Sequence, residues 1–379
     1  SLFRGIVKLD THDTSLTQFI LTAQTEFLEA AVRELKRLDP QVRSGALLAP
    51  GIALCSAPDV ARLQRGAADA RPIFARHLAP AQAIIPLSNT EQDIGALAIA
   101  IADLPGFALL ERGQRFSVQS RFAQQDEPDN ARKRAYSTGM LNQQLAQAFA
   151  EETGAVEHIK KPQVVVSVLC TFEQAYTGIS LARENLSDWP GGMRHFAHTA
   201  DEISRAEFKL LEALEVFGLA LPSSGSALDL GAAPGGWTRL LLETGLRVVA
   251  VDPAQLDPRL YRHPRLEHYR GYAEGYLEEA LRRRVKFDVI ANDMRMDARE
   301  AARALVQAAP CLQPGGIVIS TLKLPHSTYE IDPLKNLNEA LHVLNQRYDV
   351  TQARQLFHNR QEVTVVAARP RSKPVYTGR

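Results

Sequence analysis

The chain has 379 residues, with 44 basic and 43 acidic side chains that leave a formal net charge of +1. This length exceeds what a single hydrophobic core usually supports, so we expect two or three domains. Cys55, Cys170 and Cys311 are too few and too far apart for a disulfide framework or a Cys-x-x-Cys site, so we expect buried thiols and no metal. The balanced charge excludes a global attraction to nucleic acid, and any such binding must come from local basic patches.

Two further patterns bear on where the protein works. No apolar run approaches the roughly 20 residues that a membrane-spanning helix needs. The first residues also lack the charged, apolar and cleavage regions of a secretory signal peptide. We therefore expect a cytoplasmic protein that has no membrane contact and no obligate protein partner.

We predict that residues 1–75 form a small α+β unit. Gln18 to Thr22 is a short β-like run, Phe27 to Leu38 has apolar residues at helical spacing, and Ala46 to Leu54 is again extended. A second α+β unit, residues 76–183, begins near Phe74 to Ile85. Its predicted elements are a helix over Glu91 to Leu104, a strand over Arg115 to Phe122, a helix over Thr138 to Glu152, and a hairpin of Gln163 to Leu169 with Gln174 to Leu181.

Residues 184–203 contain Trp189-Pro-Gly-Gly192 and little periodicity, which predicts a linker. From residue 204 to residue 379, strand and helix patterns alternate. The strands that we predict are Ala227 to Leu230, Arg247 to Val251, Leu266 to Tyr269, Phe287 to Asn292, Gly316 to Leu322, Tyr348 to Gln355 and Glu362 to Ala368. Seven strands with helical crossovers predict an α/β domain with a doubly wound sheet.

The segment from Leu228 to Thr238 joins a buried strand, a glycine turn and the start of a helix, which is where α/β sheets bind nucleotide-like ligands. The glycines lack the Cβ that would block a ligand. Their spacing does not fit G-x-G-x-x-G, and no phosphate-binding G-x-x-x-x-G-K-[ST] occurs, so S-adenosylmethionine is the cofactor that fits best. Asp252 ends the next strand, where an acid accepts hydrogen bonds from ribose hydroxyls. The predicted cofactor-binding residues are Asp229, Gly231, Ala232, Ala233, Pro234, Gly235, Gly236, Trp237, Asp252 and Asp293.

Four charged residues lie near the same predicted edge of the sheet. Asp293 and Lys323 end two strands, Lys209 lies on the helix before the first strand, and Glu362 begins the last strand. A lysine at the end of a mostly apolar strand is costly unless it is paired or used in chemistry. The sequence therefore predicts a functional set of two lysines and two acids beside the glycine turn.

These motifs resemble the FtsJ family of Rossmann-fold ribose 2'-O-methyltransferases. The resemblance rests on Ser204-Arg-Ala-x-Phe-Lys209, on Asp229-Leu-Gly-Ala-Ala-Pro-Gly-Gly-Trp237, on Asp293-Met294, on Lys323 and on Glu362-Val. It implies that Lys209, Asp293, Lys323 and Glu362 form the catalytic Lys-Asp-Lys-Glu tetrad that acts on a ribose hydroxyl. Lys323 would be the base, Asp293 and Lys209 would set its pKa, and Glu362 would hold the lysines.

This chain departs from the family pattern at two places. Where relatives carry an acid that contacts the adenine amino group, this chain has Tyr272, with Glu274 two residues later, so either of these residues is a candidate adenine contact. Asn292 and Arg295 flank Asp293-Met294 and alter the usual Asp-Met-Ala-Pro loop.

The N-terminal half resembles a ferredoxin-like piece followed by a THUMP RNA-binding domain, on Arg115 to Phe122 and Lys160-Lys-Pro-Gln-Val-Val-Val-Ser-Val168. This layout is similar to that of bacterial methyltransferases of 23S ribosomal RNA, so the resemblance implies RNA as the substrate and partner. Transfer RNA is an alternative substrate, and a non-catalytic RNA-binding protein is an alternative class. The candidate RNA-binding residues are Arg132, Lys133, Arg134, Lys160 and Lys161, with a weaker cluster at Arg282 to Arg284 and Lys286.

Overall fold

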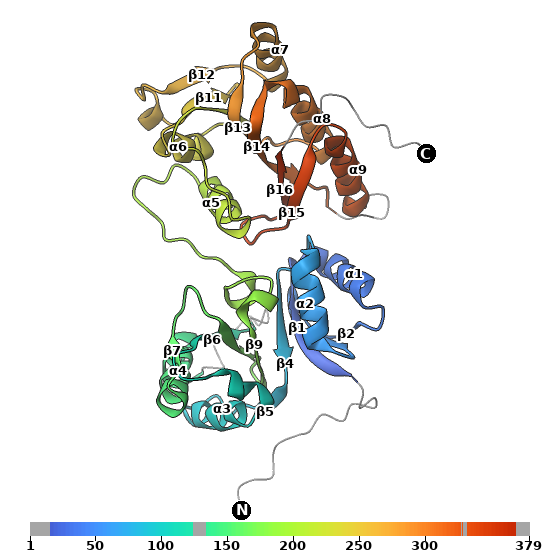
Figure 1. Ribbon diagram of the computed structural model, residues 1–379, viewed down its shortest axis with the longest axis vertical. Helices are drawn as coiled ribbons and strands as arrows, with labels where there is room; N and C mark the ends of the chain where they lie inside the picture. Colours follow the sequence, from blue (N-terminus) through green and yellow to red (C-terminus); the bar gives the residue numbers. More distant parts are fainter. Residues whose placement is uncertain (1–15, 124–133, 327, 329–331, 369–379) are drawn as a thin grey trace, which may run out of the picture. The chain divides into compact units, whose positions relative to one another are not determined.

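The computed structural model describes residues 16–123, 134–326, 328 and 332–368 of the chain. It divides into two compact units, Ser1–Arg194 and His195–Arg379, drawn in blue to green and in green to red in Figure 1. Each unit has its own sheets and its own hydrophobic core. None of the helices in the described ranges is long and apolar enough to cross a membrane.

The first sheet of the N-terminal unit is antiparallel, with the strand order β2-β3-β1-β4. The alternation of strands and helices along the chain is the ferredoxin-like βαββαβ arrangement. Its elements are β1 (Thr17–Thr22), α1 (Leu28–Leu38), β2 (Arg43–Ala49), β3 (Ile52–Ala57), α2 (Val60–Ala70) and β4 (His77–Ala81).

One prediction for this sheet was wrong. The single extended run over Ala46 to Leu54 is in fact the hairpin of β2 and β3, which turns at Gly51 with φ of +74°, a value that suits glycine. The run Phe74 to Ile85, where the second unit was expected to begin, contains two strands: β4 pairs with β1, and β5 (Ala83–Pro86) pairs in the next sheet. Helix α2 was not predicted, although Val60, Leu63, Gln64 and Ala67 form its buried face at helical spacing.

The second sheet of this unit has the order β5-β9-β8-β6-β7. The predicted strand Arg115 to Phe122 and the predicted hairpin of β8 with β9 are confirmed, and β8 also lies parallel to β6. Its elements are α3 (Gln92–Ala102), β6 (Arg115–Phe122), α4 (Thr138–Thr153), β7 (Val156–Glu157), β8 (Val164–Cys170) and β9 (Gln174–Leu181). Helices α3 and α4 cover one face of the sheet and bury its main core.

The segment predicted as a linker is shared between the units. Asn185 is fully buried and accepts a hydrogen bond from Gln64 (2.9 Å), and the short 3-10 helix Pro190–Gly192 packs against the second sheet. Farther along, the ring of Phe196 stacks on Phe208 of the C-terminal unit, with centroids 5.8 Å apart. Residues up to 194 therefore belong to the N-terminal unit.

The C-terminal unit is built on the predicted seven-stranded sheet, with the order β12-β11-β10-β13-β14-β16-β15. The first five of these strands are parallel, and β16 is antiparallel to both of its neighbours. The strands are β10 (Ser226–Leu230), β11 (Arg247–Val251), β12 (Leu266–Tyr269), β13 (Phe287–Asn292), β14 (Leu312–Lys323), β15 (Asp349–Arg354) and β16 (Glu362–Ala368).

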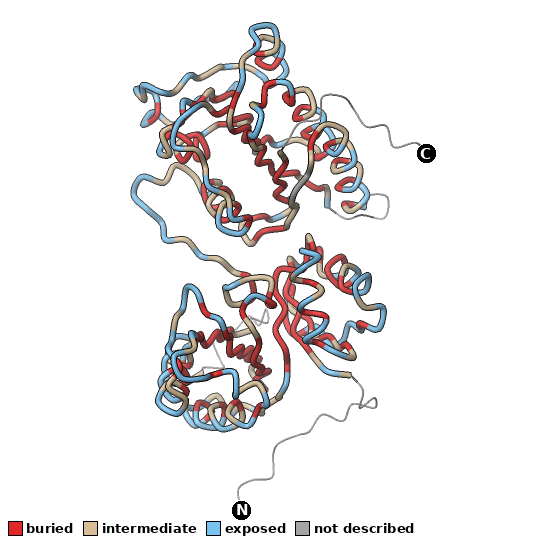
Figure 2. The backbone as a smooth tube through the Cα atoms, viewed as in Figure 1, coloured by how far each residue is buried: buried red, intermediate tan, exposed pale blue. Residues whose placement is uncertain are grey.

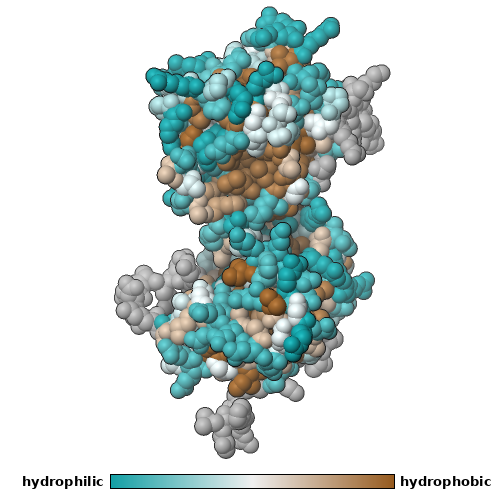
Figure 3. Space-filling view, turned by 60° about the vertical axis from the view of Figure 1, so that its left-hand side comes forward, coloured by the Kyte–Doolittle hydropathy of each residue, from teal (hydrophilic) through white to brown (hydrophobic). Residues whose placement is uncertain are grey.

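Helices cover both faces of this sheet, as Figure 1 shows for α5 and α6 on one side and for α7, α8 and α9 on the other. The helices are α5 (Ala206–Val216), α6 (Gly236–Glu243), α7 (Ala273–Arg283), α8 (Ala298–Ala308) and α9 (Pro333–Asn345). The strands between them are buried along most of their length (Figure 2). In the view of Figure 3, hydrophobic residues also gather in one patch on the surface of this unit. The predicted α/β fold with a doubly wound sheet is confirmed.

Candidate active site

The candidate site lies where the strand order of the large sheet changes direction. The connection that leaves β10 leads to β11 on one side, while β13 lies on the other side, and open α/β sheets bind ligands outside the carboxyl ends of such strands. Leu230 and Asn292 are register partners at these two ends. The amide of Asp293 donates to the Leu230 carbonyl (3.2 Å), so Asp293 follows β13 directly beside the glycine turn.

The four predicted tetrad residues meet at this edge. Lys209 Nζ lies 2.7 Å from Glu362 Oε1 and 3.3 Å from Asp293 Oδ1. Lys323 Nζ donates to Asp293 Oδ1 (2.6 Å) and also contacts Glu362 Oε2. Lys323 and Glu362 are register partners in the antiparallel pair of β14 and β16, while Lys209 comes from α5. Each lysine therefore touches both acids, although the four residues span more than 150 positions of the sequence.

The acids decide the charge state of this cluster. Burial lowers the pKa of Lys323, but the charges of Asp293 and Glu362 outweigh burial and raise its pKa above the ordinary lysine value. Burial raises the pKa of Asp293, but the charges of Lys323 and Lys209 outweigh burial and hold its pKa below the ordinary aspartate value. In the free protein Lys323 is therefore an ammonium and Asp293 a carboxylate.

The glycine turn is shaped by contacts within the protein. A Cβ on Gly231, whose φ is +74°, would lie 2.7 Å from Cγ and 2.8 Å from Cα of Met294. A Cβ on Gly235, whose φ is +114°, would lie 2.4 Å from Cδ1 of Leu260, and one on Gly236 would lie 2.5 Å from Oγ of Ser204. Each of these glycines therefore makes room for neighbouring atoms of the same domain, which belong to Met294, Leu260 and Ser204.

Asp229 is the most unusual polar residue under the turn. Its side chain is fully buried, Oδ2 accepts a hydrogen bond from Thr238 Oγ1 (2.6 Å), and Oδ1 has no hydrogen-bond partner among the described residues. Burial raises the pKa of Asp229 to about 7. A buried acceptor without a donor is costly, so Oδ1 of Asp229 is suited to accept a hydrogen bond from a ligand.

Comparison with known families identifies this region. The family model of FtsJ-like methyltransferases matches residues 203–347. These residues form an FtsJ-like methyltransferase domain. The match contains Lys209, the glycine turn, Asp293 and Lys323, while Glu362 lies beyond its end.

Curated relatives extend the similarity. A ribosomal RNA large subunit methyltransferase M of Halorhodospira halophila is 36% identical over 188 residues, which cover 49% of this chain and 52% of that protein. The protein with the same name in Marinobacter nauticus is 36% identical over 214 residues, which cover 52% of this chain and 55% of that protein. The chain thus matches about half the length of these relatives. Among solved structures, TrmN from Thermus thermophilus is 18% identical over 93% of this chain and 99% of that chain, with a TM-score of 0.38.

The other predicted cofactor contacts of the FtsJ-like domain differ in their burial and in their hydrogen-bond partners. Asp252 Oδ2 accepts from the Ala233 amide (3.0 Å), and its two oxygens keep further acceptor capacity. Trp237 is buried, and its Nε1 donates to the Ala206 carbonyl (2.7 Å), so its ring fastens α6 to α5. Tyr272 is 73% exposed at the start of α7, and Glu274 is also exposed.

Thr321 is a member of this site that the sequence analysis missed. It lies on β14 two residues before Lys323, is fully buried, and donates a hydrogen bond to Asp293 Oδ1. Its hydroxyl also accepts a hydrogen bond from Lys323 Nζ (3.2 Å). The only local signal was the alternation along the strand, which puts residues 321 and 323 on one face.

The main set of predicted RNA-binding residues lies in the N-terminal unit, and its members differ in exposure to solvent. Arg132 and Lys133 fall outside the described residues. Arg134 is partly buried, with its guanidinium 4.4 Å from the centre of the Phe122 ring and donating to the Thr171 carbonyl (2.8 Å), so it is used within the unit. Lys160 and Lys161 are exposed, as are Arg282 to Arg284 in the FtsJ-like domain.

Proposed function

We propose that this chain is an S-adenosylmethionine-dependent ribose 2'-O-methyltransferase that acts on RNA, with 23S ribosomal RNA as its substrate. The observation that carries this proposal is the convergence of Lys209, Asp293, Lys323 and Glu362 beside the turn that follows β10. The relatives named as ribosomal RNA large subunit methyltransferases support the choice of substrate. We further propose that residues 76–183 are a THUMP-like RNA-binding domain.

The residues around the turn fit the proposed cofactor. Asp229 Oδ1 is a buried acceptor that needs a donor, and Asp252 offers carboxylate lone pairs at the end of β11, where ribose hydroxyls of nucleotide ligands bind. We therefore assign the cofactor to the edge formed by Asp229, by the segment from Gly231 to Pro234, and by Asp252. When bound there, S-adenosylmethionine supplies an electrophilic methyl group on a sulfonium.

The residues of the chain then have to accept the proton that the ribose 2'-hydroxyl loses. A ribose 2'-hydroxyl is a weak nucleophile, and it becomes a strong one as it loses its proton during attack. In the free protein Lys323 is an ammonium, so it must give up a proton before it can accept one from the hydroxyl. A positive charge brought close to Lys323 lowers its pKa, and so does any loss of contact with Asp293 or Glu362. Lys209 keeps both acids paired while Lys323 changes its state.

Thr321→Val removes the hydroxyl that joins Asp293 to Lys323 and keeps the shape of the side chain. We expect kcat to fall about tenfold to a hundredfold, because a lost hydrogen bond to a charged group is worth about 1.5–3 kcal/mol. KM for RNA should stay within about twofold, because Thr321 is fully buried and touches no solvent. The readout specific to positioning is the pH profile of kcat, whose basic limb should move. A profile that keeps its shape would assign Thr321 to packing alone.

Asp229→Asn tests both the cofactor assignment and the buried charge. The folded-state pKa of Asp229 is raised to about 7, so between pH about 4 and pH about 7 the folded protein binds a proton that the unfolded chain has released. Stability therefore falls as the pH rises through this window. The asparagine variant escapes that loss, and its urea midpoint should fall less than that of the wild type between pH 5 and pH 8. Calorimetry should show affinity for S-adenosylmethionine about tenfold weaker, and an unchanged affinity would remove Asp229 from the cofactor site.

The experiment that tests the function uses the full chain, tritiated S-adenosylmethionine and three acceptors: unmodified 23S ribosomal RNA made by transcription, total transfer RNA, and a small-molecule mixture. We expect label in the 23S RNA, and nuclease digestion with mass spectrometry should place the methyl group on a ribose. Label in transfer RNA alone would move the substrate to that class. Binding of RNA without any transfer would leave only an RNA-binding protein.

A further inference from the structure

A cluster of aromatic side chains lies beside the tetrad in the C-terminal unit. Its buried centre is Phe208, which precedes Lys209 on α5. The outer rings come from the segment before α5 and from the loop before β16, and they are His195, Phe196, His198, Phe357 and His358. These five residues lie outside the range 203–347 that matches the family model, so the match does not account for them.

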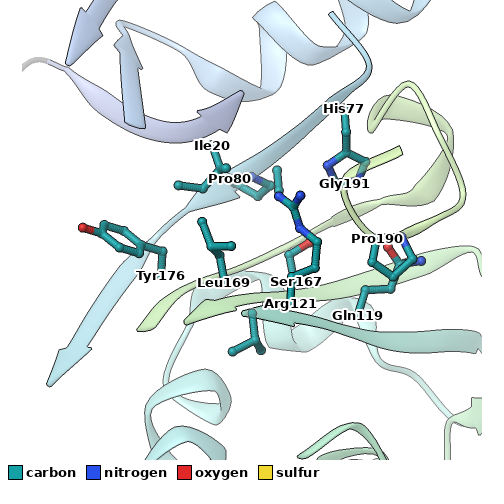
Figure 4. A pocket seen from close by; sticks show the side chains of 12 residues that line it. Ile20, His77, Pro80, Gln119, Arg121, Ser167, Leu169, Tyr176, Pro190 and Gly191 are labelled. Atoms are coloured by element: carbon teal, nitrogen blue, oxygen red, sulfur yellow. The ribbon is translucent and has the colours of Figure 1, made fainter. Parts of the chain in front are cut away.

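The segment before α5 changes its packing partner at residue 195. Before it, Gly191 is held by the N-terminal unit, since a Cβ at Gly191 would overlap the guanidinium of Arg121, and Figure 4 shows these two residues together. From His195 onward the chain belongs to the C-terminal unit. The ring of His195 contacts the ring of Phe357, with centroids 4.9 Å apart. This contact places His195 against the loop before β16.

The loop before β16 places the cluster at the edge of the sheet where the tetrad lies. Strand β16 is antiparallel to β14, and Glu362 at its start is the register partner of Lys323. The loop that precedes Glu362 therefore lies at the same edge. Glu212 of α5 accepts hydrogen bonds from the amides of Phe357 (2.8 Å) and His358 (2.9 Å), so both residues are held beside α5.

The rings of the cluster differ in their exposure to solvent. Phe208 is buried, Phe196 and Phe357 are partly buried, and His195 is exposed. The planes of His195 and Phe357 meet at 73°, which is a T-shaped arrangement. A T-shaped contact covers a face of only one of its two rings, so the faces of the other ring are not covered by that contact. This pair can therefore accept a further flat ring from solvent.

Two exposed arginines flank the cluster. Arg360 lies in the loop before β16, two residues before Glu362. Arg205 lies at the start of α5, three residues before Phe208, and residues three apart share one face of a helix. Aromatic rings beside exposed cations are typical of proteins that bind a single nucleic-acid strand, because bases stack on the rings while cations contact the phosphates.

We propose that His195 and Phe357 stack on a nucleobase of the RNA strand that carries the target ribose, and that Arg205 and Arg360 contact phosphates of the same strand. This inference rests on the proposed function, because it takes the substrate to be RNA. Unpaired RNA bases are commonly held by stacking on Phe, Tyr, Trp or His. A base held at the cluster fixes the strand while the 2'-hydroxyl of a nearby ribose reaches the tetrad.

The first measurement compares the binding of two fluorescein-labelled RNA decamers to the full chain by fluorescence anisotropy. One decamer consists of uridines and the other of abasic riboses. Both carry the same number of phosphates, so the ratio of their affinities isolates the contribution of the bases. Stacking of one base on aromatic side chains contributes about fivefold to a hundredfold in affinity. The ratio should therefore fall by about fivefold or more in His195→Ala and in Phe357→Leu.

Two further variants separate stacking from folding. His195→Phe keeps a ring at residue 195, so its affinity ratio should stay within about twofold of the wild-type ratio. His342→Ala is the matched control, because His342 is exposed in the last turn of α9, which leads into the start of β15 at the opposite edge of the sheet. Since His195 is exposed and leucine keeps most of the apolar volume of Phe357, both test variants should fold, and their thermal midpoints check this.

The second measurement tests the phosphate contact by repeating the anisotropy titrations over a range of potassium chloride concentrations. Arg360→Ala should reduce the slope of log affinity against log salt by about 0.7 for both decamers, because one contact to a single strand is lost. Its ratio of uridine to abasic affinity should stay at the wild-type value. His195→Ala should show the reverse, with a lower ratio and an unchanged slope.

Three results would overturn the proposal. An equal affinity ratio in the wild type, in His195→Ala and in Phe357→Leu would assign the cluster to packing within the domain. A loss in His195→Phe as large as that in His195→Ala would show that the ring is not what binds. An unchanged salt slope in Arg360→Ala would remove the phosphate contact. Neither measurement depends on methyl transfer, so failure of the proposed activity is read separately in the tritium assay.

Discussion

Lys323→Ala is expected to lower the rate of methyl transfer by a factor of about 10²–10⁴, the usual contribution of a positioned acid or base. Lys323 Nζ is the one group of the tetrad that touches Asp293, Glu362 and Thr321 together. Its removal leaves both acids paired with Lys209, so the fold and the cofactor site should persist. Single-turnover transfer from tritiated S-adenosylmethionine measures the rate, and calorimetry measures cofactor affinity.

The matched control is Arg247→Ala in the same unit. Arg247 is exposed and lies at the start of β11, whereas the tetrad lies at the carboxyl edge of the sheet. This variant should keep the wild-type rate. If Lys323→Ala also kept its turnover, the base would have to be another group, and the assignment of Lys323 would fail.

Much of the C-terminal fold could be predicted because its local signals agree. The strands β11 and β13 begin and end at the predicted residues, since mostly apolar runs there are bounded by turns and by polar residues. The hairpin of β2 and β3 was not predicted, because apolar residues lie on both sides of its two-residue turn and make one continuous apolar run, although Pro50-Gly51 is a turn signal. The change of sheet between β4 and β5 has no local signal, because a single residue separates the two strands.

The tetrad was predictable for a different reason. Its four residues occur in segments that resemble the motifs of a known family. This resemblance predicted that the four side chains come together, although they are far apart in the sequence. The balance of charges in the cluster was not predictable, because it depends on distances such as the 2.6 Å between Lys323 and Asp293. Residues without a motif were missed even where they are buried and charged. Glu212 of α5 is the clearest example, since a glutamate in a helix is ordinarily exposed.

Glu212 is 2% exposed and holds the loop that leads into β16. Its Oε1 accepts from the Phe357 amide (2.8 Å), and its Oε2 accepts from the His358 amide (2.9 Å) and contacts His358 Nδ1 (2.7 Å). The His358 ring also packs against Phe208 of α5, with centroids 5.4 Å apart. Glu212 lies on α5, the helix that also supplies Lys209. It thus fixes the position of the segment that lies four residues before Glu362.

Glu212→Ala should therefore destabilise the C-terminal unit and impair the tetrad together. Two partly buried amides lose their acceptor, at about 1–3 kcal/mol each, so we expect the free energy of unfolding to fall by about 2–6 kcal/mol. Urea unfolding measures this loss, and Glu215→Ala, at an exposed position of the same helix, is the control. At temperatures where the variant stays folded, kcat should also fall, because Glu362 is no longer held opposite both lysines. A stable variant with normal kcat would show that the loop before β16 holds its position without Glu212.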